Sequence, residues 1–220
     1  FDAHGGGIHN GIMDQSMAFA LAFDTFNLYM GINAVDDTHQ NGHTGTNGGW
    51  DGDSVQIAFT NAARDAPASE MILYNYGLND DGVTHNVHHQ AHPCPDTSDC
   101  TEAAMQRFED TTTTVYEIKI PAHGLGVDTL TDGMVLGFGM CLNDGDTEDG
   151  QDGQKGWTGW GPYSIVYGKN SPAAGLMTLV GDSPPSAHWV ACGSSANGCT
   201  AVPVPRCGHR AARGLVLQLR

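Results

Sequence analysis

The sequence has few basic residues and no long apolar run, and each absence excludes a class of function. Only 9 of the 220 residues are Lys or Arg, against 25 Asp and Glu, so the formal net charge is −16. Nucleic acids and anionic membrane surfaces are bound through clustered positive charge, which this chain lacks. A membrane-spanning helix needs roughly 20 consecutive apolar residues, and no segment approaches that length. We therefore expect no nucleic-acid partner and no membrane span.

Helical periodicity is also nearly absent, whereas apolar and polar residues alternate along several short runs. The 30 glycines indicate many tight turns between these runs. Val55, Ile57 and Phe59 alternate with small or polar residues, so one side of that strand is expected to be buried. The segment 101–110 is the one helix-like piece. The expected strands are residues 17–23, 28–35, 55–59, 71–76, 114–120, 134–142, 163–167 and 176–180.

This pattern predicts an all-β fold, an antiparallel β-sandwich of about eight or more strands. The composition changes near residue 181, where Pro184, Pro185 and a Gly/Ser/Asn stretch are typical of a linker. We expect a sandwich domain over residues 1–182 and a poorly packed Pro/Gly/Cys-containing linker or tail over residues 183–220. Because the chain begins at Phe1, we also expect a processed or excised domain.

Two pairs of cysteines each enclose a short polar turn. Cys94 and Cys100 bracket a Pro/Asp-rich loop, and Cys192 and Cys199 bracket a Gly/Ser/Asn-rich loop. This spacing favours local disulfides over a zinc site, although six cysteines allow 15 connectivities. We therefore expect an extracellular or secreted protein. Cys141 lies inside an apolar run and is expected to be a buried thiol.

Four motifs follow one another along the chain: Leu28-Tyr29 with Val35-Asp-Asp-Thr-His39, Trp50-Asp-Gly-Asp-Ser-Val-Gln56, Tyr116-Glu-Ile-Lys-Ile-Pro121 and Leu136-Gly-Phe-Gly-Met-Cys-Leu-Asn-Asp144. In this order they resemble the family 9 carbohydrate-binding modules and the related DOMON-like β-sandwiches. The resemblance covers about residues 1–180. It implies a jelly-roll-like sandwich, usually extracellular, often attached to glycan-degrading enzymes, with bound calcium and a sugar site flanked by aromatic residues.

The sugar site that this resemblance implies carries over in part. Trp50 and Asp53 match the family pattern Trp-x-x-Asp-x-x-Glu, but Gln56 stands where the family has Glu. An amide still donates and accepts hydrogen bonds, without the strength of a charged partner. Asn143 matches the family's Asn after the late strand. The second stacking Trp is either Trp157 or Trp160.

Local chemistry supports the same residues, with alternatives open. Strand alternation extended back to Trp50 puts Trp50 and Gln56 on the outward side, although Trp50 is equally compatible with the core. The segment 156–163 places two Trp and one Tyr among glycines in an expected loop, which favours a contact surface. The predicted carbohydrate-binding residues are Trp50, Gln56, Asn143, Trp157, Trp160 and Tyr163.

An acidic loop follows the late strand and contains no basic residue. Its carboxylates repel one another unless solvent or a cation screens them, and oxygen ligands of this kind suit Ca²⁺. A solvated acidic loop is the alternative. Asp36 and Asp37, at the end of an expected strand, form a second candidate pair. The predicted calcium ligands in the loop are Asp144, Asp146, Glu148, Asp149 and Asp152.

Nothing in the sequence favours catalysis. The histidines of segment 85–92 could ligate Zn²⁺ or Cu²⁺, but no Glu lies among them, and a polar loop is the interpretation we prefer. No nucleophile elbow is present. The leading hypothesis is a non-catalytic, calcium-stabilised carbohydrate-binding domain that binds a polysaccharide or oligosaccharide. The expected parent is a larger secreted glycan-degrading protein. One alternative is a structural or assembly domain without sugar binding. The other is a DOMON-type haem domain, but Met30, Met140 and the histidines do not identify a pair of haem ligands. A haem cofactor is therefore not expected.

Overall fold

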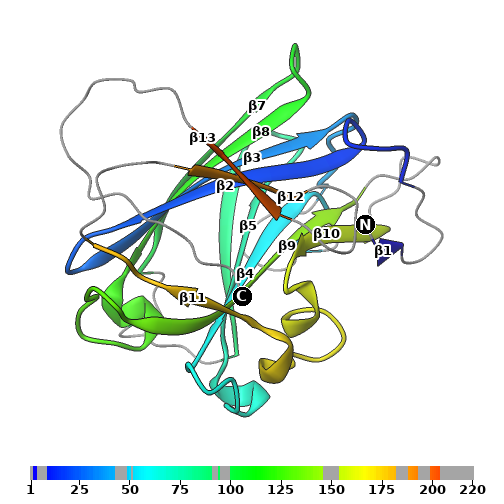
Figure 1. Ribbon diagram of the computed structural model, residues 1–220. Helices are drawn as coiled ribbons and strands as arrows, with labels where there is room; N and C mark the ends of the chain where they lie inside the picture. Colours follow the sequence, from blue (N-terminus) through cyan, green and yellow to red (C-terminus); the bar gives the residue numbers. More distant parts are fainter. Residues whose placement is uncertain are drawn as a thin grey trace.

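The computed structural model describes residues 9–42, 49–50, 52–83, 94, 100–145 and 154–181, and the backbone alone of residues 2–3, 84–90, 188–192 and 199–203. Within these ranges the chain forms two antiparallel sheets that lie face to face (Figure 1). This arrangement confirms the predicted all-β, jelly-roll-like sandwich. No helix among these residues is long and apolar enough to cross a membrane.

One sheet, named here the β4 sheet, carries the candidate site. Its strand order is β1-β10-β9-β4-β5-β6, and β11 pairs with β9 beside β10. The strands are β1 (Asp2–Ala3), β4 (Ser54–Thr60), β5 (Ile72–Leu78), β6 (Thr84–Gln90), β9 (Val135–Asp144), β10 (Gly156–Trp160) and β11 (Gly175–Thr178).

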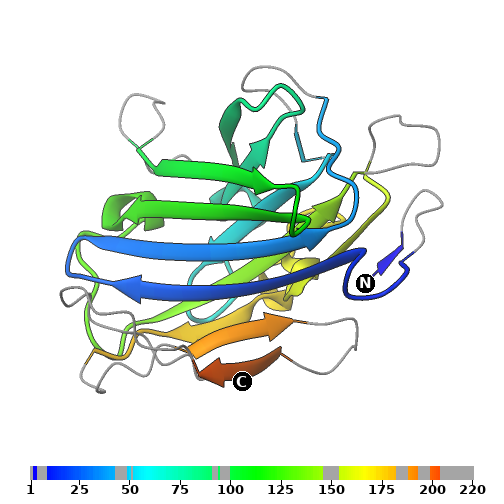
Figure 2. The same cartoon turned by 90° about the horizontal axis from the view of Figure 1, so that it is seen from above.

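The other sheet, named here the β3 sheet, forms the opposite layer. Figure 2 shows its strands side by side in the order β13-β12-β2-β3-β8-β7. They are β2 (Gln15–Phe23), β3 (Asn27–Asp36), β7 (Glu102–Phe108), β8 (Thr113–Pro121), β12 (His188–Cys192) and β13 (Cys199–Pro203).

The main core lies between the two sheets. Every second residue of β2, β3 and β8 is buried, as strand alternation requires when one face packs and the other meets solvent. Phe138 of β9 lies centrally, with ring centroids 6.3 Å from Phe19, 5.6 Å from Phe59 and 5.4 Å from Trp160. This apolar packing fixes which side of each strand faces inward.

The outer face of the β4 sheet is covered by the chain that follows β10. A second apolar cluster forms there from Ala58, Met71, Leu73, Cys141, Trp157, Ile165 and Val166. Glycines in the strands below allow the close approach: a Cβ on Gly139 would lie 2.0 Å from Ser164 Oγ. Cys141 is a buried free thiol, as predicted.

Four segments differ from the sequence-based expectations. Residues 163–167, expected as a strand, form a turn with the 3-10 helix Pro162–Ser164, because Gly161 is left-handed and Pro162 begins the helix. Segment 101–110, expected to be helix-like, contains β7, which pairs with β8 along its whole length. The expected loops at 85–92 and 156–163 contain β6 and β10. In β6, β7 and β10, hydrogen-bonded pairing with a neighbouring strand outweighs the weak local sequence pattern.

Part of the expected tail joins the β3 sheet. β12 pairs with β2, and β13 pairs with β12, so the hairpin extends the sheet beyond β2 (Figure 2). The register places Cys192 opposite Cys199, next to the turn. That placement suits the predicted disulfide, which stays a prediction because only the backbone is described there.

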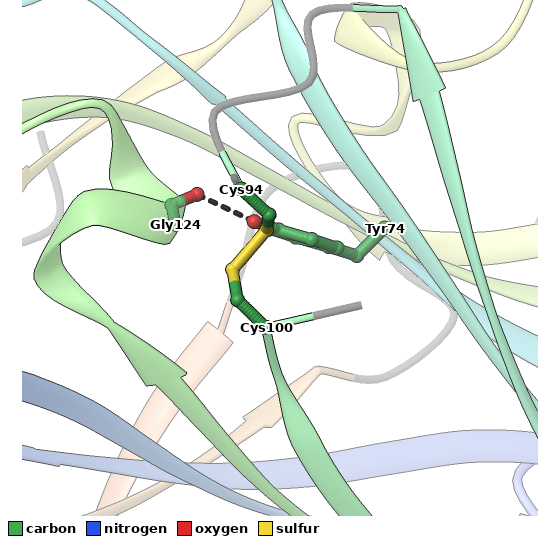
Figure 3. The surroundings of a disulfide bond; sticks show 4 residues. All are labelled: Tyr74, Cys94, Cys100 and Gly124. Atoms are coloured by element: carbon green, nitrogen blue, oxygen red, sulfur yellow. Dashed lines mark hydrogen bonds between the residues drawn. A yellow bond between two sulfur atoms is a disulfide. The ribbon is translucent and has the colours of Figure 1, made fainter. Parts of the chain in front are cut away.

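The structure contains the predicted Cys94–Cys100 disulfide, which packs against the core (Figure 3). The Tyr74 hydroxyl lies beside it and donates a hydrogen bond to the Gly124 carbonyl at 2.5 Å. A Cβ on Gly124 would approach Cys100 Sγ to 3.2 Å, so the chain fits closely around the sulfur atoms. The bridge therefore ties together two positions of the β6–β7 connection, and the turn after β8 packs closely against it.

Candidate functional site

Gln56 and Asn143 lie side by side on the outer face of the β4 sheet. Val55, Ile57 and Leu142 point into the core, so the residues that alternate with them point outward. The register pairs Ser54 with Asn143 across β4 and β9. Gln56 is on the outward side of β4, as predicted, but it is buried rather than exposed to solvent.

A chain of hydrogen bonds connects these polar side chains. The Asn143 Nδ2 donates to Ser54 Oγ at 3.0 Å and to Gln56 Oε1 at 3.3 Å. Gln154 Nε2 donates in turn to Asn143 Oδ1 at 2.7 Å. Asn75 of β5 is directly opposite Gln56 in the register and is also buried. Because Ser54, Gln56, Asn75 and Asn143 are all buried, these amide and hydroxyl groups form a buried polar cluster beneath the outer surface.

The structure separates the two tryptophans of β10. Trp157 pairs with Asn143 in the register and packs in the outer cluster, so it shares the face of the amides. Trp160 points to the other face and packs against Phe138 in the main core. Of the two, only Trp157 is on the side of the predicted sugar site.

The four predicted aromatic residues differ in exposure. Trp50 lies in the turn before β4 and is 42% exposed, whereas Trp157 is 1% exposed beneath the edge of Tyr167. Tyr163 is 49% exposed. Trp50 precedes Ser54, the first residue of β4, by four residues. It therefore lies near the end of β4 that carries Ser54 and Gln56. Trp50 and Tyr163 are therefore available for contact, and Trp157 supports the surface from below.

Three buried carboxylates meet at one end of the main core. One oxygen from each of Asp36, Asp53 and Asp144 lies within 4.8 Å of the others. Asp36 ends β3 and Asp144 ends β9, and both continue the inward side of their strands. The sequence assigned Asp36 and Asp144 to separate candidate sites and Asp53 to the sugar motif, but the fold brings all three together.

Backbone amides orient two of these carboxylates. Asp53 accepts hydrogen bonds from the amides of Gln40 at 2.5 Å and Gly145 at 2.7 Å. Asp36 accepts one from Thr38 at 3.1 Å. The amides therefore order the loops after β3 and β9 around Asp53.

Burial and the neighbouring charges act against ionisation of this cluster. Burial, followed by the charges of Asp36 and Asp144, raises the pKa of Asp53 well above its usual range. His39, whose Nδ1 lies 3.5 Å from Asp53, adds little compensating charge because burial lowers the pKa of this histidine. A bound divalent cation would relieve the repulsion and keep all three carboxylates ionised.

Further polar groups extend the inward side of the β3 sheet toward this cluster. Gln15 is directly opposite Asp36 in the β2–β3 register, and its side-chain amide is buried. Neither its oxygen nor its nitrogen has a hydrogen-bond partner within the described part of the chain, and the same holds for the Thr114 hydroxyl. Sequence reasoning missed Gln15, although it shares the inward alternation of Met17 and Phe19.

The remaining predicted metal ligands do not join this cluster or lie outside the described residues. Asp37 follows Asp36 but is exposed and is not part of the group. The haem alternative gains no ligand pair, because Met30 and Met140 both pack in the main core. The predicted ligands outside the described residues are Asp146, Glu148, Asp149 and Asp152.

Comparison with known families agrees with this geometry. The sequence profile described as carbohydrate family 9 binding domain-like matches residues 6–182. This chain belongs to that family. It is a family of binding modules that are generally non-catalytic.

Solved structures show the same fold for this family 9-like domain. A carbohydrate binding module family 9 from Caldicellulosiruptor kristjanssonii in complex with glucose matches with a TM-score of 0.54, 17% identity, and coverage of 77% of this chain and 78% of that chain. The same module in complex with cellotriose matches with a TM-score of 0.53, 17% identity, and coverage of 76% of each chain. No curated protein matches the sequence.

Proposed function

We propose that this family 9-like domain binds a carbohydrate without catalysing a reaction on it. The observation that carries the proposal is the half-exposed Trp50 in the turn before β4, the strand that contributes Gln56 to the buried Gln56–Asn143 amide pair. A sugar ring has an apolar C–H face, which stacks on an indole, and a rim of hydroxyls, which pair with amides. The sugar-bound structures of similar family 9 modules support the same ligand class.

The chemistry of the outer face supports binding rather than hydrolysis. Glycoside hydrolysis uses two carboxyl groups on either side of the scissile bond. The described polar residues around Asn143 are amides and a hydroxyl, from Gln56, Gln154 and Ser54. The buried carboxylates lie on the inward side of the strands instead.

A calcium ion held by Asp36, Asp53 and Asp144 would stabilise the site. Hard Ca²⁺ takes six to eight oxygen ligands, and these three carboxylates supply several of them. The buried side-chain oxygen of Gln15, opposite Asp36, fits a further ligand position. Asp144 adjoins Asn143, and Asp53 follows Trp50 by three residues. Calcium would therefore hold the two segments that carry the sugar-binding side chains.

An extracellular location fits the same account. The Cys94–Cys100 disulfide is typical of proteins that fold in an oxidising compartment. A binding module of this kind could direct a larger secreted glycan-degrading protein to its polysaccharide. A test is secretion of the intact parent protein, followed by mapping of its free thiols.

Calorimetric titration of the calcium-loaded chain with cellotriose tests the proposed binding. Trp50→Ala should weaken affinity about tenfold or more, because the stacking surface is lost. Phe26→Ala is the matched control, since Phe26 is also an exposed aromatic residue but lies in the β2–β3 turn, away from the candidate site. It should bind like the wild type.

Circular dichroism must show that both variants retain the β-sheet spectrum. Equal affinities for wild type and Trp50→Ala would remove Trp50 from the site. A folded wild type that binds no glycan would favour the structural or assembly alternative.

A further inference from the structure

Two exposed tyrosines lie together in the segment that follows β10. Tyr167 is 71% exposed and Tyr163 is 49% exposed. Their rings are nearly parallel, at 17°, with centroids 6.4 Å apart. Both belong to the segment that crosses the outer face of the β4 sheet after β10.

The tyrosine surface is supported by buried residues rather than by a loose loop. Tyr167 meets Trp157 edge to face at a centroid distance of 5.3 Å. Between the tyrosines, Ile165 and Val166 are buried in the outer apolar cluster. These contacts hold the rings in place before any ligand binds, which reduces the entropy lost on binding.

The backbone at Tyr167 adopts a conformation that bulky residues avoid. Tyr167, Gly168 and Lys169 have positive φ values of 58°, 110° and 63° in succession, and only the second is glycine. Lys169 Nζ closes the turn by donating to the Ile165 carbonyl at 2.8 Å. Unfavourable backbone conformations that the surrounding structure maintains are concentrated at functional sites. Here the strained turn presents a tyrosine to solvent.

We propose that Tyr163 and Tyr167 form a second subsite, which stacks against further pyranose units of a neutral glycan chain. This inference rests on the proposed function, and it adds that the domain binds an extended chain rather than a single sugar. The subsite is continuous with the first, because Asn143 and Trp157 are neighbours on β9 and β10 and Trp157 contacts Tyr167. An exposed aromatic ring can pack against the apolar C–H face of a sugar unit.

Charge selects a neutral ligand over an anionic one. The net charge of −16 disfavours polyanions, including uronic acid polymers. The nearest described cation, Lys169, is half-buried and engaged with the Ile165 carbonyl. The described residues of the tyrosine surface therefore offer aromatic rings for stacking, and their one cation is already engaged.

Calorimetric titrations of the calcium-loaded chain with glucose, cellobiose, cellotriose and cellotetraose test this subsite. Wild-type affinity should rise with chain length. Tyr167→Ala should weaken cellotetraose binding about three- to tenfold and leave glucose binding unchanged. Tyr163→Ala should weaken cellotetraose binding by a similar factor. Tyr167→Phe retains the ring and should retain most of the affinity, and Phe26→Ala should match the wild type.

The two proposals fail in different ways. Two outcomes overturn only the second subsite, provided that wild type binds all four sugars. In the first, the tyrosine variants keep the chain-length dependence of the wild type. In the second, Tyr167→Ala loses affinity for glucose by the same factor as for cellotetraose. If folded wild type binds none of the sugars, both proposals are overturned. A dimer in sedimentation experiments that Tyr167→Ala abolishes, without any chain-length effect, would instead assign the surface to self-association. Tyr163→Ala gives the same test if Tyr167→Ala fails to fold.

Discussion

Asp53 is subject to interactions that change its pKa in opposite directions. Burial and the charges of Asp36 and Asp144 raise the pKa, whereas the hydrogen bonds from the Gln40 and Gly145 amides lower it. The raising effects dominate, so the folded protein without a cation binds a proton at Asp53 more tightly than the unfolded chain does. A cation replaces that proton.

This balance predicts an unusual pH dependence for the calcium-free protein. The unfolded-state pKa of an aspartate is about 3.9. Below this unfolded-state pKa, Asp53 is protonated in both the folded and the unfolded state. Between the unfolded-state pKa and the raised folded-state pKa, the folded state holds more protons than the unfolded state. Stability therefore falls as the pH rises through this range. In chelator, the free energy of unfolding should decrease as pH rises through this window. Urea denaturation at a series of pH values measures it.

Asp53→Asn removes the titrating group and should remove that part of the pH dependence. At neutral pH in chelator the removal of a buried charge is opposed by the loss of one acceptor, because the Gln40 and Gly145 amides donate to different oxygens of Asp53, so the pH dependence is the readout. A wild type whose stability in chelator rises steadily across the same window would contradict the assignment.

The sequence predicts some site residues and not others, for physical reasons. Strand alternation identifies Gln56 as outward-facing, and the motif order identifies Asn143. The partners Ser54, Gln154 and Gln15 could not be assigned, because their contacts depend on the register between strands distant in sequence. Alternation also does not show that Gln56, although it points outward, is buried.

At the scale of elements, β10 and the turn after it show where local pattern misleads. Five residues rich in glycine and tryptophan look like a loop, yet β10 pairs with β9 along its length. Pairing sends Trp157 and Trp160 to opposite faces, so only Trp157 shares the face of Gln56 and Asn143. Glycine is needed here because neighbouring backbones approach too closely for a side chain.

Gly159→Ala tests this close packing. A Cβ at residue 159 would lie 2.1 Å from the Met140 carbonyl oxygen, and a strand backbone cannot move away easily. We expect the free energy of unfolding to fall by about 1–3 kcal/mol, measured by urea denaturation. Gly181→Ala is the control, because its nearest neighbour, Asp132 Cβ, would be 3.4 Å away. A Gly159→Ala protein as stable as the control would show that β10 packs differently.

At the scale of the whole molecule, the carboxylate cluster connects the two layers of the sandwich. Asp36 belongs to the β3 sheet, whereas Asp53 and Asp144 adjoin β4 and β9 of the other sheet. An ion bound by all three would bridge the open end of the core. The sequence predicts the sandwich itself, but it cannot predict this bridge, which depends on how the sheets stack.

Calcium should therefore stabilise the fold as a whole. At a concentration of 100 times its Kd, a ligand that binds only the folded state adds about 2.7 kcal/mol. Saturating calcium should raise the melting temperature of wild type relative to chelator, in a thermal unfolding scan. Asp36→Asn should lose most of this shift, whereas Asp37→Asn, at the exposed neighbouring position, should keep it. Equal shifts in both variants would place calcium elsewhere.

A glycan array probed with the calcium-loaded full chain, with Trp50→Ala alongside, tests the central claim most directly. The account predicts that wild type binds neutral glycans, that longer chains bind better than single sugars, and that Trp50→Ala loses this signal while it stays folded. A blank array from folded, calcium-loaded wild type, or binding that does not depend on Trp50, would contradict it.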